Sequence, residues 1–132
     1  MNLQPVVTAL QALPELKQVQ IGADLAGRED IVEQYPSVYV APMKEISTEV
    51  VNATGCVLQS VDQQFITLTV CMYADLEATR EAMLGALIGL PLYPSGNISP
   101  IEFVEGEQVE GTGTLVWWRD IFVARKQRRF TT

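Results

Sequence analysis

The sequence contains no histidine and only two cysteines among its 132 residues. Histidine is the usual general acid or base near neutral pH, so its absence argues against an enzyme of that kind. Two cysteines without histidine are too few ligands for a structural zinc site. Cys56 and Cys71 would pair only in an exported chain, and we expect both to be buried free thiols.

Long apolar segments are also missing. No uncharged apolar run reaches the roughly 18 residues that a membrane-spanning helix requires. The first ten residues, MNLQPVVTAL, lack the cationic start of a signal peptide. A hydrophobic content of 48% with 19% charged residues is typical of a folded domain. We therefore expect one domain over residues 1–132, cytoplasmic and without a membrane partner.

Basic residues are scarce. Nine of them oppose sixteen acidic residues, and four of the nine are Arg125, Lys126, Arg128 and Arg129. Residues 1–124 therefore carry a balance of −11. A body of this charge repels a phosphate backbone. We expect the basic cluster to meet an acidic protein surface, or to be solvated, rather than to bind nucleic acid.

The sequence offers little for catalysis or metal binding. Four glutamates, Glu102, Glu105, Glu107 and Glu110, lie in one predicted strand, in which Glu105 and Glu107 would share one face and Glu102 and Glu110 the other. A catalytic carboxyl pair needs one member withdrawn from water, whereas this segment reads as a solvated acidic edge. It also lacks the spacing of a calcium loop. We expect no catalytic residue, no metal ligand and no cofactor.

Apolar spacing predicts the elements of the first half of the chain. The residues from Leu3 to Leu13 predict a helix over 3–12, with Pro5 in its first turn. Two short strands follow, one at 18–21 closed by Gly22 and one at 38–40 ended by Pro42. Between them, 23–34 fits either a capped helical turn or a buried segment. Residues 43–54 are either a loop or the flank of a hairpin.

The strand signal is strongest after Gly55. Residues 55–60 and 63–73 predict two strands separated by a turn at Val61 and Asp62. In the second strand one face carries Ile66, Leu68, Val70 and Met72, and the other carries Thr67 and Thr69. This alternation predicts a sheet with one face in the core.

A helix follows, with Asp75 as its N-cap residue. Its apolar side comprises Leu76, Met83, Leu84, Leu87 and Leu90, while Glu77, Arg80 and Glu81 face water. Gly85 and Gly89 either permit a close backbone approach or mark unwinding, and unwinding is favoured at Gly89.

The closing segment, 101–130, predicts a long β-hairpin that turns at Gly111-Thr112-Gly113. Trp117 and Trp118 then point to opposite faces. The set that contains Trp117 is more apolar and is predicted to be buried, which leaves Trp118 and Phe122 as interface anchors beside the basic cluster. The predicted fold is α+β: an antiparallel or mixed central sheet, two helices packed on one face, and this hairpin.

The chain resembles the tail terminator, or tail completion, proteins of long-tailed bacteriophages. The matching features are PSVYVAP, QSVDQQFITLTV, a helix that ends LGALIGLP, an IEFVEGE strand and a VWWRDIFVARK strand, in that order. They span most of the chain, and the C-terminal third is the most specific part.

The resemblance implies a non-catalytic virion subunit, assembled in the host cytoplasm, that forms a ring of six copies at the head–tail junction. Such a ring caps the tail tube protein and offers a docking face to the neck or head-completion protein, with a sheath protein nearby if the tail is contractile. DNA would pass through the channel without specific binding. On this basis some of the four glutamates line the lumen, the basic cluster reaches a neighbour, and 43–54 orders on docking.

Two other functions are open at this stage. A small α/β ligand-binding module without catalysis would need an apolar pocket with a few converging polar groups. A nucleic-acid-binding subunit that uses 125–132 would show steep salt dependence.

Overall fold

The computed structural model describes residues 2–22, 34–53, 56–92 and 100–131, and at 48–53, 56–58, 112 and 127–131 it describes the backbone alone. In chain order the elements are α1 (Gln4–Gln11), β1 (Gln18–Ile21), β2 (Ser37–Ala53), β3 (Cys56–Met72), a 3₁₀ turn η2 (Tyr73–Asp75), α2 (Leu76–Leu87), β4 (Glu102–Thr112) and β5 (Leu115–Thr131). The predicted α+β fold with a long C-terminal hairpin is confirmed.

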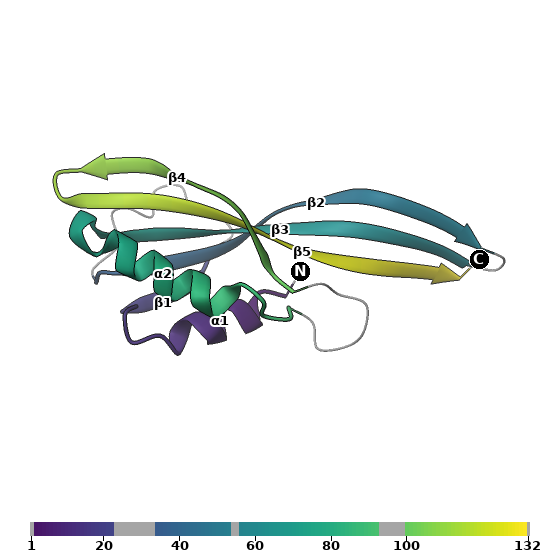
Figure 1. Ribbon diagram of the computed structural model, residues 1–132, viewed down its shortest axis with the longest axis horizontal. Coiled ribbons are helices and arrows are strands. Elements are labelled where there is room, and N and C mark those ends of the chain that lie inside the picture. The colour runs from purple at the N-terminus through teal and green to yellow at the C-terminus, as the bar shows by residue number, and fades with distance from the viewer. Residues whose placement is uncertain (1, 23–33, 54–55, 93–99, 132) are drawn as a thin grey trace.

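The strands form one mixed sheet in the order β1-β2-β3-β5-β4. Only β1 and β2 run parallel, and the other neighbouring strands are antiparallel. Both helices cover the same face of one half of the sheet (Figure 1). Beyond them β2, β3 and β5 continue as a three-stranded projection. We call this projection the wing and define it as residues 45–53, 56–63 and 124–131, where β1 and β4 no longer pair with the sheet.

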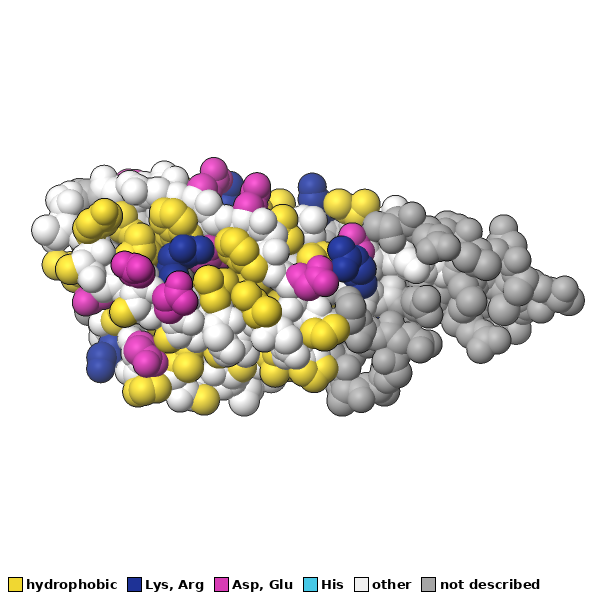
Figure 2. Space-filling view, viewed as in Figure 1, with side chains coloured by type: hydrophobic (Ala, Val, Ile, Leu, Met, Phe, Trp, Pro, Cys, Tyr) yellow, Lys and Arg dark blue, Asp and Glu magenta, His cyan; other side chains and the backbone are white. Residues whose placement is uncertain are grey.

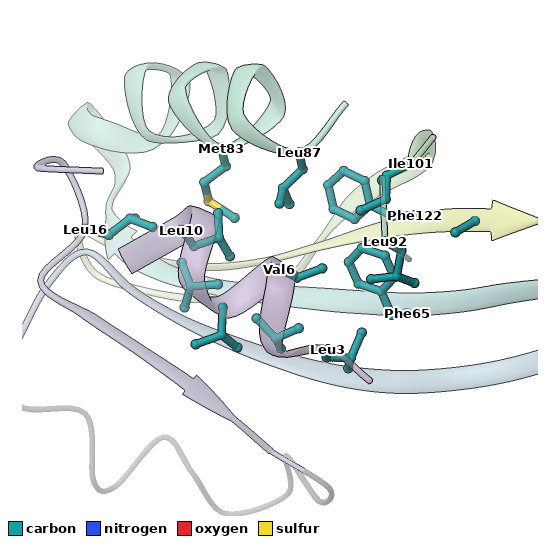
Figure 3. Packing of buried hydrophobic residues seen from close by; sticks show 14 residues of the cluster. Leu3, Val6, Leu10, Leu16, Phe65, Met83, Leu87, Leu92, Ile101 and Phe122 are labelled. Carbon is teal, nitrogen blue, oxygen red and sulfur yellow. The ribbon is translucent and has the colours of Figure 1, made fainter. Parts of the chain in front are cut away.

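The main core lies between the helices and the sheet (Figure 3). Val6 and Leu10 enter it from α1, and Met83 and Leu87 from α2. The sheet contributes the stacked rings of Phe65 and Phe122, whose centroids are 5.3 Å apart, together with residues that include Val38, Val40 and Ala124. Burial of these side chains stabilises the fold by roughly 1.5–3 kcal/mol each before entropy is counted.

The predictions for α1 and β1 are confirmed. A proline stands in the first turn of α1, where its missing N–H breaks no helical bond. The buried residues Val6, Val7 and Leu10 repeat at helical spacing and hold the helix on the core. The segment 23–33, for which two readings were open, lies outside the described residues.

Pro42 does not end its strand, contrary to the prediction. It lies beside a register shift between Pro42 and Lys44, two residues beyond Val40, where the pairing of β1 with β2 stops. Proline is tolerated in a strand at a bulge or at an open edge, because its nitrogen is then not required for a ladder bond. The next residues therefore continue as the hairpin flank, one of the two readings for 43–54.

The predicted turn at Val61 and Asp62 is also wrong, because β3 is continuous through both residues. Val61 is 3% exposed, and Asp62 lies opposite Arg125 and forms an ion pair with it at 3.2 Å. Val61 is β-branched and disfavours the left-handed backbone of a tight hairpin turn. The pairing of β2 with β3 instead extends to Ala53 opposite Cys56, and residues 54–55 lie outside the described residues.

The predicted alternation in β3 is present, but the face that the helices cover is the one with the threonines. Thr67 and Thr69 are fully buried, and the Thr69 hydroxyl lies 3.4 Å from the sulfur of Met83 on α2. Leu68 and Val70 lie on the opposite face in a second cluster with Tyr39 and Trp117. Residues 67–70 are thus buried on both faces of the sheet, whereas the alternation predicted a sheet with only one face in the core.

The helix predicted after Asp75 is confirmed as α2. Asp75 occupies the N-cap position, but its side chain forms no capping hydrogen bond. The helix gives way at Gly89, whose φ of +88° favours glycine, so the unwinding predicted there is confirmed. Within the described part of this chain, nothing lies within 4 Å of a Cβ placed on Gly85, so no close backbone approach occurs there inside the subunit. Among the described residues no helix is long and apolar enough to cross a bilayer.

Candidate interaction surfaces

Arg80 of α2 and Asp120 of β5 form an ion pair on the helix-covered face of the sheet. Arg80 Nη2 donates to Asp120 Oδ1 at 2.8 Å, and Nε donates to Oδ2 at 3.3 Å. Asp120 is 1% exposed. The indole Nε1 of Trp118 donates to the same Oδ1 at 3.0 Å. The buried carboxylate is thereby satisfied by donors from two elements, and the pair ties α2 to the sheet.

Arg80 was predicted to face water, and this is wrong. Its guanidinium carbon lies 4.7 Å from the ring centroid of Trp118 and 5.9 Å from that of Phe103. A guanidinium over an aromatic face is attracted by the ring quadrupole. The side chain is therefore held by a buried carboxylate and two rings, although helical periodicity alone places it among exposed neighbours.

Trp118 is consequently half-buried inside its own subunit. It serves as part of the contact between β5 and α2, and an additional role at a subunit interface stays a prediction. Phe122, by contrast, is fully buried in the main core. The prediction that Phe122 is an exposed anchor is wrong, because β5 lies between β3 and β4 with buried residues on both faces.

Gly106 of β4 creates the space for this contact. A Cβ placed on it would lie 2.3 Å from Asp120 Oδ1 and 2.8 Å from Trp118 Nε1. No real side chain tolerates such distances, so the carboxylate and the indole occupy the volume that a larger residue would need. This role of Gly106 depends on residues 12 and 14 positions away, so no local sequence signal indicates it.

The four glutamates of β4 lie on a single face of the sheet. They oppose Val123, Ile121, Arg119 and Trp117, which are alternate residues of a regular β5 and share the face opposite the helices. Two register shifts produce this arrangement, because Val104 and Val109 are unpaired bulge residues. The predicted division of the glutamates into one pair on each face applies only to an unbroken strand, and β4 has two bulges. The residues concerned are Glu102, Glu105, Glu107 and Glu110.

Two of these glutamates form ion pairs on the sheet surface. Glu107 contacts Arg119 directly across the strand pair. Arg125 bridges Glu102 at 3.0 Å and Asp62 at 3.2 Å. The glutamate side chains of these pairs are more than half exposed, so each pair stabilises the fold by about 1 kcal/mol or less. In the space-filling view, acidic and basic groups lie side by side among apolar ones (Figure 2).

The basic cluster is divided along the wing. Arg125 belongs to the network with Glu102 and Asp62, and Lys126 is half-buried. Arg128 and Arg129 lie closer to the tip, opposite Gln59 and Leu58 of β3. All four cationic positions are therefore on the last strand of the projection.

Metal ligands and cysteine thiols are the remaining candidates for chemistry among the described residues. Within the described ranges no group of three His, Cys, Asp or Glu side chains comes together as a metal site. Cys71 is a free, fully buried cysteine, as predicted. Burial, and secondarily the charge of Asp75, raises the pKa of its thiol to about 11, so at neutral pH it is an unreactive thiol. The side chain of Cys56 lies outside the described part of the structure.

Two surface hollows bear on the ligand-binding alternative. One, of about 300 Å³, is lined by Tyr73, Ala74, Leu76, Glu77 and Arg80. The other, of about 350 Å³, is lined in part by the exposed residues Pro14, Glu15 and Lys17. Ligand sites are typically apolar and enclose most of their ligand. Neither hollow has that character.

The family model described as phage tail terminator protein matches residues 1–132. Curated proteins give no match. Among solved structures, a chain from "Virion of native gene transfer agent (GTA) particle" has a similar fold. The two share 20% identity with a TM-score of 0.60, over 93% of this chain and 92% of that chain. At this identity the likeness concerns the fold.

Proposed function

Because this chain belongs to the phage tail terminator family, we propose that copies of it, about six by the resemblance described above, form a ring that caps the tail tube. Family membership makes the chain a structural, non-enzymatic protein of the virion tail. The observation that carries the proposal is the extent of the match, which covers all 132 residues rather than a single motif.

The ring would stop tube growth by covering the surface to which the next ring of tube protein would add. Its opposite side would then dock the neck or head-completion protein, with the sheath protein as a further neighbour in a contractile tail. An elongated subunit with a projecting wing is suited to several neighbours at once, because it offers both a helix-covered body and two strand edges (Figure 1).

The acidic face of β4 would line the channel. Two bulges place all four glutamates of the strand on the face opposite the helices. A lumen lined by carboxylates repels phosphates, so DNA can slide through it without a specific site. This orientation would leave the helices on the outside of the ring.

Electron microscopy and light scattering of the purified chain, alone and with its tail tube protein, test the proposal. We expect ring-shaped particles of about six copies and, in mixtures, tubes that stop growing when the chain is added. A chain that stays monomeric with tube protein at every concentration, and leaves tube length unchanged, would refute it.

A further inference from the structure

We infer that neighbouring copies join by strand addition, with the outer edge of β5 in one wing pairing with the outer edge of β2 in the next. This inference rests on the proposed ring and specifies the contact that closes it. The occupant of each edge is a second copy of this chain.

The wing offers two open strand edges among the described strands. On one side β4 pairs with β5 only as far as Glu102 opposite Val123. On the other side β1 pairs with β2 only as far as Ile21 opposite Val40. The three wing strands continue past both points. An open edge presents a row of backbone donors and acceptors that an added strand can pair with.

The two edges differ in charge. The wing part of β2 contains Glu45 and Glu49 and no cation, whereas the wing part of β5 contains Arg125, Lys126, Arg128 and Arg129 and no anion. The edges are therefore complementary to each other, and each is unsuited to a copy of itself.

The complementarity extends to both faces of the sheet. Glu45 opposes Gln63, which opposes Ala124, so Glu45 shares the helix-side face with Arg128. Glu49 opposes Ser60, which opposes Gln127, so Glu49 shares the other face with Arg129. An edge-to-edge joint that keeps the faces in common thus gives each face an anion from one edge and cations from the other.

This pattern favours a ring over a two-fold dimer. Two β5 edges would bring four cations against four cations, and two β2 edges would oppose their glutamates. Pairing β5 with β2 is a head-to-tail contact, and head-to-tail contacts close into rings when the rotation between copies permits. The charge pattern of the wing therefore selects the symmetry that a cap on a tube requires.

Charge reversal in matched variants tests the inference. Glu45→Lys with Glu49→Lys makes both edges cationic. Arg128→Glu with Arg129→Glu makes the outer part of the β5 edge anionic like the β2 edge, while Arg125 and Lys126 remain. Like charges across an interface are strongly unfavourable, so each variant should need about 100-fold more protein to assemble than the wild type. The control is Glu77→Lys with Glu81→Lys, the same charge change at exposed positions of α2, which should assemble normally.

Mixing the two reversed variants gives the decisive measurement. A head-to-tail joint predicts that the mixture assembles again, as alternating rings with equal numbers of both variants, which native mass spectrometry can count. A single chain that carries all four substitutions should also assemble. This recovery separates an interface effect from damage to the wing, such as loss of the 2.6 Å hydrogen bond from Gln63 to Glu45.

The possible results distinguish failure of the strand addition from failure of the proposed ring. Reversed variants that form rings as readily as the wild type overturn the strand addition and leave the proposed ring intact. Reversed variants that fail both alone and as a mixture also overturn it. If they form rings but no longer stop tube growth, the edges bind tube protein and the inference is wrong. A wild-type chain that never assembles refutes the proposed function itself.

Discussion

The guanidinium of Arg80 contacts the carboxylate of Asp120 at 2.8 Å, across the gap between α2 and β5. Asp120 is almost fully buried, while the Arg80 side chain is 23% exposed. Removal of one partner from a buried pair leaves an uncompensated charge, which costs more than the pair contributes as a whole. The same pair positions the indole of Trp118, so its loss should affect both stability and local structure.

We predict that Arg80→Met lowers the free energy of unfolding by about 2–3 kcal/mol, a value reduced from that of a fully buried pair because Arg80 is partly exposed. Urea unfolding followed by Trp fluorescence measures this. The double variant Arg80→Met with Asp120→Asn should recover part of the loss, since it removes the isolated charge. Equal stability of the wild type and Arg80→Met would contradict the role assigned to the pair.

Gly106→Ala should destabilise the protein by about 1–3 kcal/mol, because the added methyl group overlaps the carboxylate of Asp120. Gly85→Ala is the matched control, as its Cβ would meet nothing within 4 Å in the middle of α2. Since alanine favours helix over glycine by about 1 kcal/mol, this control should be stabilising. Thermal unfolding of both variants would reveal the opposite signs, and a stable Gly106→Ala protein would refute the crowding.

The raised pKa of the Cys71 thiol leads us to predict that the protein loses stability in alkali. Its pKa in the folded chain is about 11, against an ordinary value of 9.0. Between these two pH values the unfolded chain releases the thiol proton while the folded chain keeps it, so stability falls as pH rises. Cys71→Ala should be less stable at pH 7 through its lost packing, but should lose less stability between pH 9 and 11. Parallel slopes for the two proteins would refute this.

Replacement of Glu102, Glu105, Glu107 and Glu110 by Gln tests the acidic face. The pairs that involve these residues are exposed, so the unfolding free energy should change by only about 1–2 kcal/mol in total. If the face lines the channel, the ring should gain affinity for DNA in a salt-dependent way. Glu77→Gln with Glu81→Gln on α2 is the control. A ring whose DNA affinity does not change would place the glutamates elsewhere.

Local patterns predicted those elements that depend on local physics. The spacing of Val6, Val7 and Leu10 is sufficient for α1, and Gly89 marks the end of α2 because few other residues adopt its backbone angle. The turn of the last hairpin likewise follows from Gly113, whose φ is +62°. These features require no knowledge of the rest of the chain.

The wrong predictions concern properties that neighbouring strands determine. The strand through Pro42 continues because β1 has already ended, and the strand through Val61 and Asp62 continues because β5 pairs with it. Phe122 is buried because both faces of β5 are covered, so alternation identifies no exposed side. Each of these facts follows from the order of strands in the sheet, which a single sequence does not specify.

The bulge residues Val104 and Val109 lengthen β4 without forming a pair with β5. Both side chains are about half exposed, at 46% and 54%, and many residues could replace them. Deletion of either one would remove a bulge and leave every remaining residue opposite its present partner, because neither bulge residue has one. Deletion of a paired residue is different, because it would shift every pair on one side of the deletion and turn those side chains to the opposite surface. The strand should therefore accept both substitution and loss at these two positions, and resist the loss of a residue between them.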